Sequence, residues 1–246
     1  MRLRSQLRFL AVYSAVITVA FAATVYLGFI HPVSGASKVT EFDRISVHRI
    51  DVVEPDGTPR LFISDRAEFP GDLFHGREFQ HKDRKDSAGM LFINDEGTED
   101  GGLIYGGAKS NGTPSSFSHL SFDQYDQDQT VNIGTALQDG QRTAGIVLND
   151  APLQAITPNL IEEGERIKSM PHGPARGEAW AALRKKYPSL MERASLLRQA
   201  DGAVGLTLKD KEGRKRLELS VDADGKPSIE LLDEQGRVQR NISLSQ

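Results

Sequence analysis

The sequence of 246 residues contains no cysteine and only one tryptophan. The lack of cysteine excludes disulfide bonds, thiolate metal ligands and thiol catalysis, so the folded part of the chain must be held together by burial and hydrogen bonding. Hydrophobic residues make up 38% of the chain, whereas 26% are charged and 23 are glycines. This supply of core-forming residues is thin, which favours extended repeats or subunit packing over one compact globule.

Charge is absent from one long stretch, the 22 residues from Phe9 to Ile30. As a helix this stretch would be ~33 Å long, which is enough to cross a bilayer core of ~30 Å. We therefore predict a transmembrane helix over residues 9–30, through which the chain contacts the membrane.

The residues on either side of this stretch indicate its orientation. Arg2, Arg4 and Arg8 precede it, and positive charge marks the cytoplasmic side of a membrane helix. We expect residues 1–8 in the cytoplasm, a linker over 31–43, and a periplasmic or extracellular C-terminal domain. This is the topology of a single-pass membrane protein.

A cleaved signal peptide is the alternative, because Ser34-Gly35-Ala36 places small residues where a signal peptidase cuts. Export signals usually have ~7–15 apolar residues, and this stretch is of full spanning length. We therefore favour a retained signal anchor.

The exported part is unevenly charged. Residues 38–154 hold 20 acidic and 11 basic residues, whereas residues 155–200 hold 8 basic and 5 acidic ones. Nucleic-acid binding requires a basic footprint, so the acidic block argues against a nucleic-acid partner.

Pairs of an acidic or amide residue followed by glycine recur through the exported part, between short segments in which apolar residues alternate. Glycine supplies the positive φ of tight hairpin turns without steric cost. We predict a mainly β fold: an antiparallel β-hairpin repeat array over residues 44–154 and a C-terminal β-meander over 201–246. Unrelated hairpins that share turn chemistry are the alternative. The pairs are Asp56-Gly57, Glu96-Gly97, Asp139-Gly140, Glu212-Gly213, Asp224-Gly225 and Gln235-Gly236.

Residues 155–200 break this pattern, because their apolar residues recur at helical spacing. Pro158 suits the start of a helix, and Pro188 must kink or divide one. We predict a short helical insertion over 155–200. Residues 67–87 show no periodicity and are expected to form a surface excursion.

The densest polar cluster contains Asp123, Asp126 and Asp128. Closely spaced carboxylate oxygens are ligands that calcium selects, so these three residues are candidate metal ligands. The residue pattern of an EF-hand loop is absent, and an acidic, solvated strand or turn is the alternative. No other cofactor is expected, because the chain contains no Walker loop, G-x-S-x-G elbow or dinucleotide fingerprint.

The same segment supports two further interpretations. If it is a strand, Asp126 and Asp128 share one side of it, ~6.6 Å apart, which is within the range for paired carboxylates of glycoside hydrolases. Alternatively, Gln124, Gln127 and Gln129 form a polar seam that fixes the register of an oligomer.

Two strings resemble a group of uncharacterised bacterial membrane-anchored envelope proteins: Ala88–Gly107 and Leu120–Gln129. These proteins also have a turn like Glu54–Gly57 and a segment like Phe69–Gly71. The resemblance covers roughly residues 44–150 and implies a bacterial origin, from which we expect a single-pass protein of the bacterial inner membrane. It brings no known activity, so no functional residue is carried over from it.

Together these observations predict a membrane-anchored extracytoplasmic binding or scaffolding protein. We expect it to self-associate as a homo-oligomer, for which a trimer is one form, or to join a membrane complex. The alternative is an envelope enzyme that acts on a polysaccharide or another polar substrate through Asp123, Asp126 or Asp128. A concave pocket that holds at least two of these carboxylates with raised pKa values would favour the enzyme.

Overall fold

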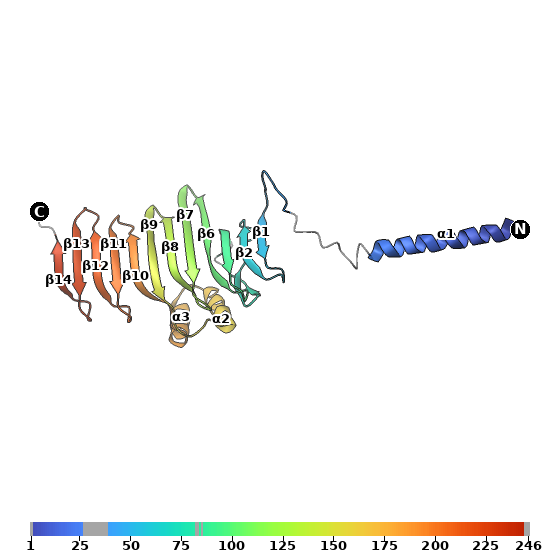
Figure 1. The fold of residues 1–246 in the computed structure, drawn as a ribbon. Helices are drawn as coiled ribbons and strands as arrows, with labels where there is room; N and C mark the ends of the chain where they lie inside the picture. Colours follow the sequence, from blue (N-terminus) through green and yellow to red (C-terminus); the bar gives the residue numbers. More distant parts are fainter. Residues whose placement is uncertain (1, 27–38, 82–83, 85, 244–246) are drawn as a thin grey trace. The chain divides into compact units, whose positions relative to one another are not determined.

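The computed structural model describes residues 2–26, 39–81, 84 and 86–243. The chain forms two compact units, Met1–Ser46 and Val47–Gln246, which are described separately (Figure 1).

The first unit contains helix α1 (Arg2–Val25). Its segment Gln6–Val25 has a mean hydropathy of 1.8 and 20 residues, so by length and composition it is able to cross a membrane. Side chains from Gln6 to Thr24 are exposed, and the Thr18 hydroxyl donates to the Ser14 carbonyl oxygen within the helix. The helix begins at Arg2, before the predicted start at Phe9, because arginine is a good helix former. The predicted end at residue 30, most of the linker and the candidate cleavage site lie outside the described residues.

The second unit is built on one antiparallel sheet of 12 strands that follow one another in chain order. Each strand pairs with the next through a turn or a longer connection, as the predicted hairpin array and meander require (Figure 1). A separate two-stranded hairpin consists of β3 (Asp72–Phe74) and β4 (Arg77–Phe79). The 12 strands are β1 (Arg49–Val53), β2 (Pro59–Ser64), β5 (Ala88–Ile93), β6 (Glu99–Ser110), β7 (Thr113–Asp123), β8 (Gln129–Gln138), β9 (Gln141–Asp150), β10 (Met191–Arg198), β11 (Val204–Lys209), β12 (Lys215–Val221), β13 (Pro227–Leu232) and β14 (Val238–Ser243).

The predicted glycine turns are confirmed, since all six glycines have φ between 75° and 93°. Four turns also share one device: the side chain at the turn's first position accepts hydrogen bonds from the backbone N–H groups two and four residues later. These side-chain hydrogen bonds stabilise the turn locally, in addition to the backbone hydrogen bonds between the strands. The four residues are Asn94, Asp210, Asp222 and Asp233.

The predicted helical insertion is confirmed in part. Helix α2 (Pro158–Lys168) begins after Thr157, whose side chain accepts from the Leu160 N–H, and helix α3 (Pro174–Lys186) follows it. The prediction was wrong for residues 191–198, which form strand β10 between β9 and β11. Pro188 disfavours the helical conformation just before it, and the sheet's backbone groups then pair with the chain beyond it.

The buried apolar side chains are concentrated at one end of the sheet. Phe62, Leu91 and Ile93 pack with Leu73 of the β3–β4 hairpin. Among the described residues from β8 to the C-terminus, the only buried apolar side chain is Ile167 of helix α2. Strands β8–β14 therefore have no apolar core of their own.

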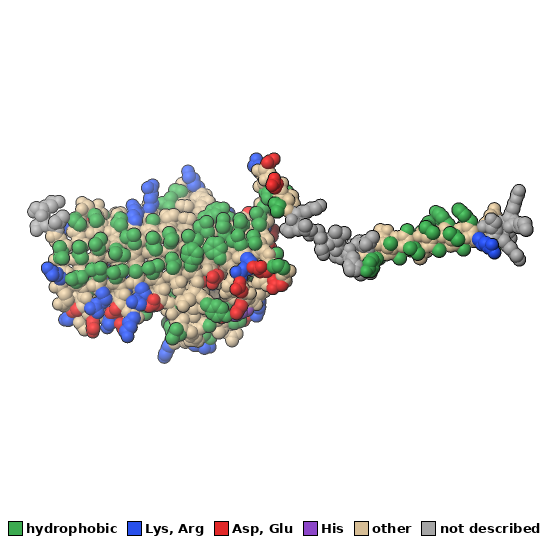
Figure 2. All heavy atoms as spheres, in the orientation of Figure 1, with side chains coloured by type: hydrophobic (Ala, Val, Ile, Leu, Met, Phe, Trp, Pro, Cys, Tyr) green, Lys and Arg blue, Asp and Glu red, His purple; other side chains and the backbone are tan. Residues whose placement is uncertain are grey.

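One face of the sheet carries two continuous apolar rows, which we call the apolar face (Figure 2). In the first row every strand contributes one aliphatic side chain, and each member is the register partner of the next. Half of its members are 39–50% exposed. The first row is Ile50, Ile63, Met90, Leu103, Leu120, Ile133, Ile146, Leu196, Leu206, Leu219, Ile229 and Ile242. The second row is Val52, Leu61, Phe92, Gly101, Phe122, Val131, Leu148, Ala194, Leu208, Leu217, Leu231 and Arg240.

Candidate functional site: an acidic pocket

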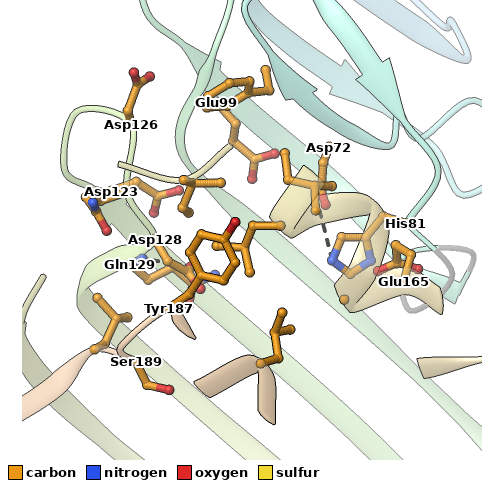
Figure 3. Close-up of a pocket in the computed structure, with 18 of the residues that line it drawn as sticks. Asp72, His81, Glu99, Asp123, Asp126, Asp128, Gln129, Glu165, Tyr187 and Ser189 are labelled. Atoms are coloured by element: carbon orange, nitrogen blue, oxygen red, sulfur yellow. Dashed lines mark hydrogen bonds and ion pairs between the residues drawn. The ribbon is translucent and has the colours of Figure 1, made fainter. Parts of the chain in front are cut away.

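A cavity of about 550 Å³ lies where the ends of strands β6 to β8 meet the β3–β4 hairpin and the two helices α2 and α3 (Figure 3). Carboxyl groups line its sheet side, and apolar side chains from the helices line the other side. Pockets with an apolar wall and a few convergent polar groups are the usual form of small-molecule sites.

Arg84 is the main positive charge at the sheet side of this acidic pocket. Its guanidinium lies 2.6 Å from Glu99 and 3.2 Å from Asp72, and the Arg84 and Glu99 side chains are 13% and 14% exposed. Burial raises the pKa of Glu99 and of Asp72, although Arg84 acts in the opposite direction. Burial also lowers the pKa of His81, whose ring lies 3.7 Å from Asp72. This part of the pocket is a largely buried ion cluster of one guanidinium and two carboxyl groups.

Asp123, at the end of β7, lies outside this ion cluster. Burial, together with the negative charges of Glu99 and Asp128, raises its pKa to about 8, although the positive charge of Arg84 acts in the opposite direction. Its Oδ1 atom and the Oε2 atom of Glu99 are both buried and have no hydrogen-bond partner among the described residues. At neutral pH the Asp123 carboxyl therefore holds a proton, and these two buried oxygens remain available to a ligand.

The structure does not place Asp126 and Asp128 on one side of a strand. Residues 124–128 form the turn between β7 and β8, so the spacing predicted for a glycosidase-like pair was wrong. Asp126 has a φ of 48°, its carboxylate is turned away from Asp123 (Figure 3), and it lies 3.3 Å from the His75 ring. The three aspartates all line the pocket, but they do not converge on one point.

In the part of the chain that the structure describes, no three His, Asp or Glu side chains are grouped as a metal site would require. The calcium site predicted at Asp123, Asp126 and Asp128 stays a prediction, and we derive no chemistry from it. The polar seam is likewise untested, although Gln127 donates to the carbonyl oxygen of Gln154 within the same chain.

The opposite wall of the pocket is apolar and aromatic. Trp180 and Leu183 of α3, with Tyr187 just after it, line this wall together with Leu160 of α2. Gly164 of α2 faces Trp180 of α3, and a Cβ atom at this position would make an ordinary van der Waals contact of 3.9 Å with the Trp180 ring. The pocket is thus able to hold the apolar body of a ligand while its polar end faces the carboxyl groups.

Sequence reasoning found the three aspartates of this site but missed Asp72, His81 and Arg84. All three lie in residues 67–87, which were predicted to be a surface excursion. In the structure this segment forms the β3–β4 hairpin, with Phe74 and Phe79 buried. The available signal was Leu73-Phe74 and Phe79 on either side of Gly76, which is the pattern of a short hairpin.

Comparison with known proteins adds no family to this description. No protein-family model matches the chain, and a search of curated proteins finds no match. The function is therefore argued from the site alone.

Proposed function

We propose that this chain is a membrane-anchored bacterial envelope protein whose exported module binds a small organic cation in the acidic pocket. In this proposal α1 is the anchor, its N-terminus is cytoplasmic, and the sheet lies outside the inner membrane. The observation that supports the ligand class is the buried, unpaired Asp123 oxygen facing a cavity with an apolar wall.

The charge balance of the pocket favours a cation. Six carboxyl groups line it, against three Lys or Arg side chains and one histidine, so acidic groups outnumber permanently positive ones. Arg84 forms ion pairs with Glu99 and Asp72, and Lys168 lies 2.7 Å from Glu165, whereas Asp123 has no such ion pair among the described residues. An ammonium group placed beside Asp123 would stabilise its ionised form and satisfy the free oxygen.

The apolar wall defines the rest of the ligand. Aromatic and aliphatic side chains opposite a carboxyl group suit a hydrocarbon or aromatic body that carries one charged end. The ligand class is therefore an amine with an apolar stem, as in a small aralkylamine or a lysine side chain.

Trp180 is the only tryptophan of the chain and lines the pocket, so its fluorescence reports directly on binding. We expect 4-phenylbutylamine to change this fluorescence saturably in the full-length protein, and 4-phenylbutanol, which has the same body without the charge, to bind at least about tenfold more weakly. Equal responses to amine and alcohol would show that charge plays no part, and no response to either would refute the proposal.

One observation favours the enzyme alternative. Asp123 holds a proton at neutral pH, as a general acid for glycoside hydrolysis must. The other pocket carboxyl groups whose pKa burial raises are Glu99 and Asp72, and neither belongs to the three predicted aspartates. Release of reducing sugar from an envelope polysaccharide, abolished by Asp123→Asn, would support catalysis over simple binding.

A further inference from the structure

The apolar face lies on the open side of the sheet. Figure 2 shows its two rows running side by side across the strands, with no helix over them. Of the 24 positions in the two rows, only Arg240 is charged, and it lies on the last strand. Single exposed apolar residues are normal on a protein surface, but a continuous patch of this size marks an interaction site.

The opposite face has a different composition over the same strands. On β12 and β13 the register pair Glu218 and Glu230 occupies the row next to Leu219 and Ile229, on the other side of the sheet. Apolar and polar positions thus alternate over residues 217–221 and 227–231, as in a sheet that is solvated on one side only. Strands β8–β14 have no apolar core in the single chain. Their alternating pattern therefore indicates that another apolar surface packs against the apolar face.

We propose that the apolar face packs against the same face of a second copy of this chain, forming a two-layered sandwich of two 12-stranded sheets. The argument from size comes first. Strands ~4.8 Å apart make each row ~53 Å long, and two rows are ~13 Å wide, so each copy offers ~700 Å². The two copies together would bury ~1,400 Å², close to the ~1,600 Å² of a standard stable interface.

Shape and charge favour a second copy over other occupants. A cover must itself be apolar, two side chains wide and as long as 12 stacked strands, and this chain provides such a surface. The rows carry no charge from β1 to β13, so two copies meet without like-charge repulsion. Sheets that pack face to face lie ~10 Å apart with interdigitating side chains, and two-fold symmetry brings the same patch of each copy together. Anchoring in one bilayer would raise the local concentration of copies.

Two two-fold arrangements satisfy this packing. If the axis runs along the rows, each strand faces the same strand of the second copy. If the two-fold axis runs along the strands, the strand order of the second copy is reversed, so that β12 of one copy faces β5 of the other. In both arrangements the central strands β8 and β9 face themselves or each other, so Ile133 of one copy lies near the centre of the interface.

The absence of cysteine makes a direct test possible. Full-length Ile133→Cys protein is reconstituted in liposomes and treated with a bismaleimide whose span matches the ~10 Å between packed sheets. We expect a crosslinked dimer at least about tenfold more abundant than with Asn132→Cys, the neighbouring residue on the opposite face. A monofunctional maleimide that labels denatured samples of both variants equally checks that each thiol is intact.

A peripheral position then distinguishes the two arrangements. Leu219→Cys alone crosslinks if each strand faces itself, whereas a mixture of Leu219→Cys and Met90→Cys proteins crosslinks if the order is reversed. Introducing Leu219→Glu into the Ile133→Cys protein should lower the dimer yield about tenfold, because it buries a charge in the interface. Ser220→Glu, one residue away on the other face, should leave the yield unchanged.

The proposal is overturned if Ile133→Cys and Asn132→Cys crosslink equally, or if neither crosslinks. Protection of the Ile133→Cys thiol from water-soluble maleimide without any dimer would show that lipid covers the apolar face, and this too refutes a second copy. None of these results depends on the acidic pocket, so the two proposals are tested independently.

Discussion

Arg84 connects two segments that are distant in sequence, because its guanidinium lies 2.6 Å from Glu99 of β6 and also donates to the Gly71 carbonyl oxygen at 2.8 Å, just before β3. The β3–β4 hairpin is thereby held against the main sheet by a buried charge. The same charge forms ion pairs with Glu99 and Asp72 on the sheet side of the acidic pocket, so the stability of the fold and the chemistry of the pocket depend on one residue.

Removing Arg84 should therefore destabilise the protein strongly. Arg84→Gln leaves Glu99 buried without its counter-charge, and breaking a buried pair in this way costs about 3–5 kcal/mol. Arg77→Gln is the matched control, since the Arg77–Glu162 pair joins side chains that are 64% and 53% exposed and should contribute less than about 1 kcal/mol. Urea unfolding measures both variants, and equal losses would contradict the role given to Arg84.

The raised pKa of Asp123 predicts a specific dependence of stability on pH. The unfolded chain ionises Asp123 near pH ~3.9, whereas the folded protein keeps it protonated up to about pH 8. Between these values the folded state holds the extra proton, so this contribution to stability is full below pH ~4 and is lost as the pH rises towards 8.

Asp123→Asn cannot titrate and should remove this dependence. Between pH 5 and 7 the stability of the wild-type protein should fall more steeply than that of the variant, by up to about 1.4 kcal/mol per pH unit. Thermal unfolding across this range provides the measurement, with Asp139→Asn in the exposed β8–β9 turn as the control. Parallel curves for wild type and Asp123→Asn would contradict a buried, protonated Asp123.

Gly97 and Gly225 have similar backbone conformations but different surroundings, so substitutions there distinguish the cost of backbone strain from the cost of a steric clash. Gly97 and Gly225 have φ values of 75° and 84°, and a Cβ atom would meet nothing within 4 Å at Gly225 but would lie 2.8 Å from the Gly76 nitrogen at Gly97. The Gly76 N–H donates to the Gly97 carbonyl oxygen at 3.0 Å, which ties the β3–β4 hairpin to the β5–β6 turn.

Gly225→Ala should cost only the strain of its conformation, about 1 kcal/mol. Gly97→Ala should cost more, about 2–3 kcal/mol, because the added methyl group also displaces the hairpin from the turn. Chemical denaturation measures the free energy of unfolding of both variants and shows which of them loses more. A larger loss for Gly225→Ala would show that the contact between turn and hairpin is unimportant.

The sequence predicted the parts of this fold that local chemistry determines. Pairs such as Asp224-Gly225 set the hairpin turns, and alternation such as that of Arg216–Val221 set the strands and their apolar side. The helical prediction for residues 191–198 rests on Met191 and Leu197, which fit a helical period, and only pairing with β9 and β11 decides that this segment is a strand. Short apolar runs carry this ambiguity in general.

The pocket was harder to predict, because its residues come from four separate parts of the chain. Asp123 was singled out for its charged neighbours, but its raised pKa arises from burial under α2 and α3 and from the approach of Glu99. The contribution of Arg84 depends on where the β3–β4 hairpin docks. Such long-range contacts leave no local signal in a single sequence.

Proton release on ligand binding tests the central claim most directly. At pH 7 Asp123 is mostly protonated, given its pKa of about 8, so an ammonium group that binds beside it should release close to one proton per site. Calorimetric titration of the full-length protein with 4-phenylbutylamine, in buffers of different ionisation enthalpy, measures this number. The account predicts a release near one proton for wild type and none for Asp123→Asn. Binding of the amine without proton release, or with the same release in the variant, would contradict it.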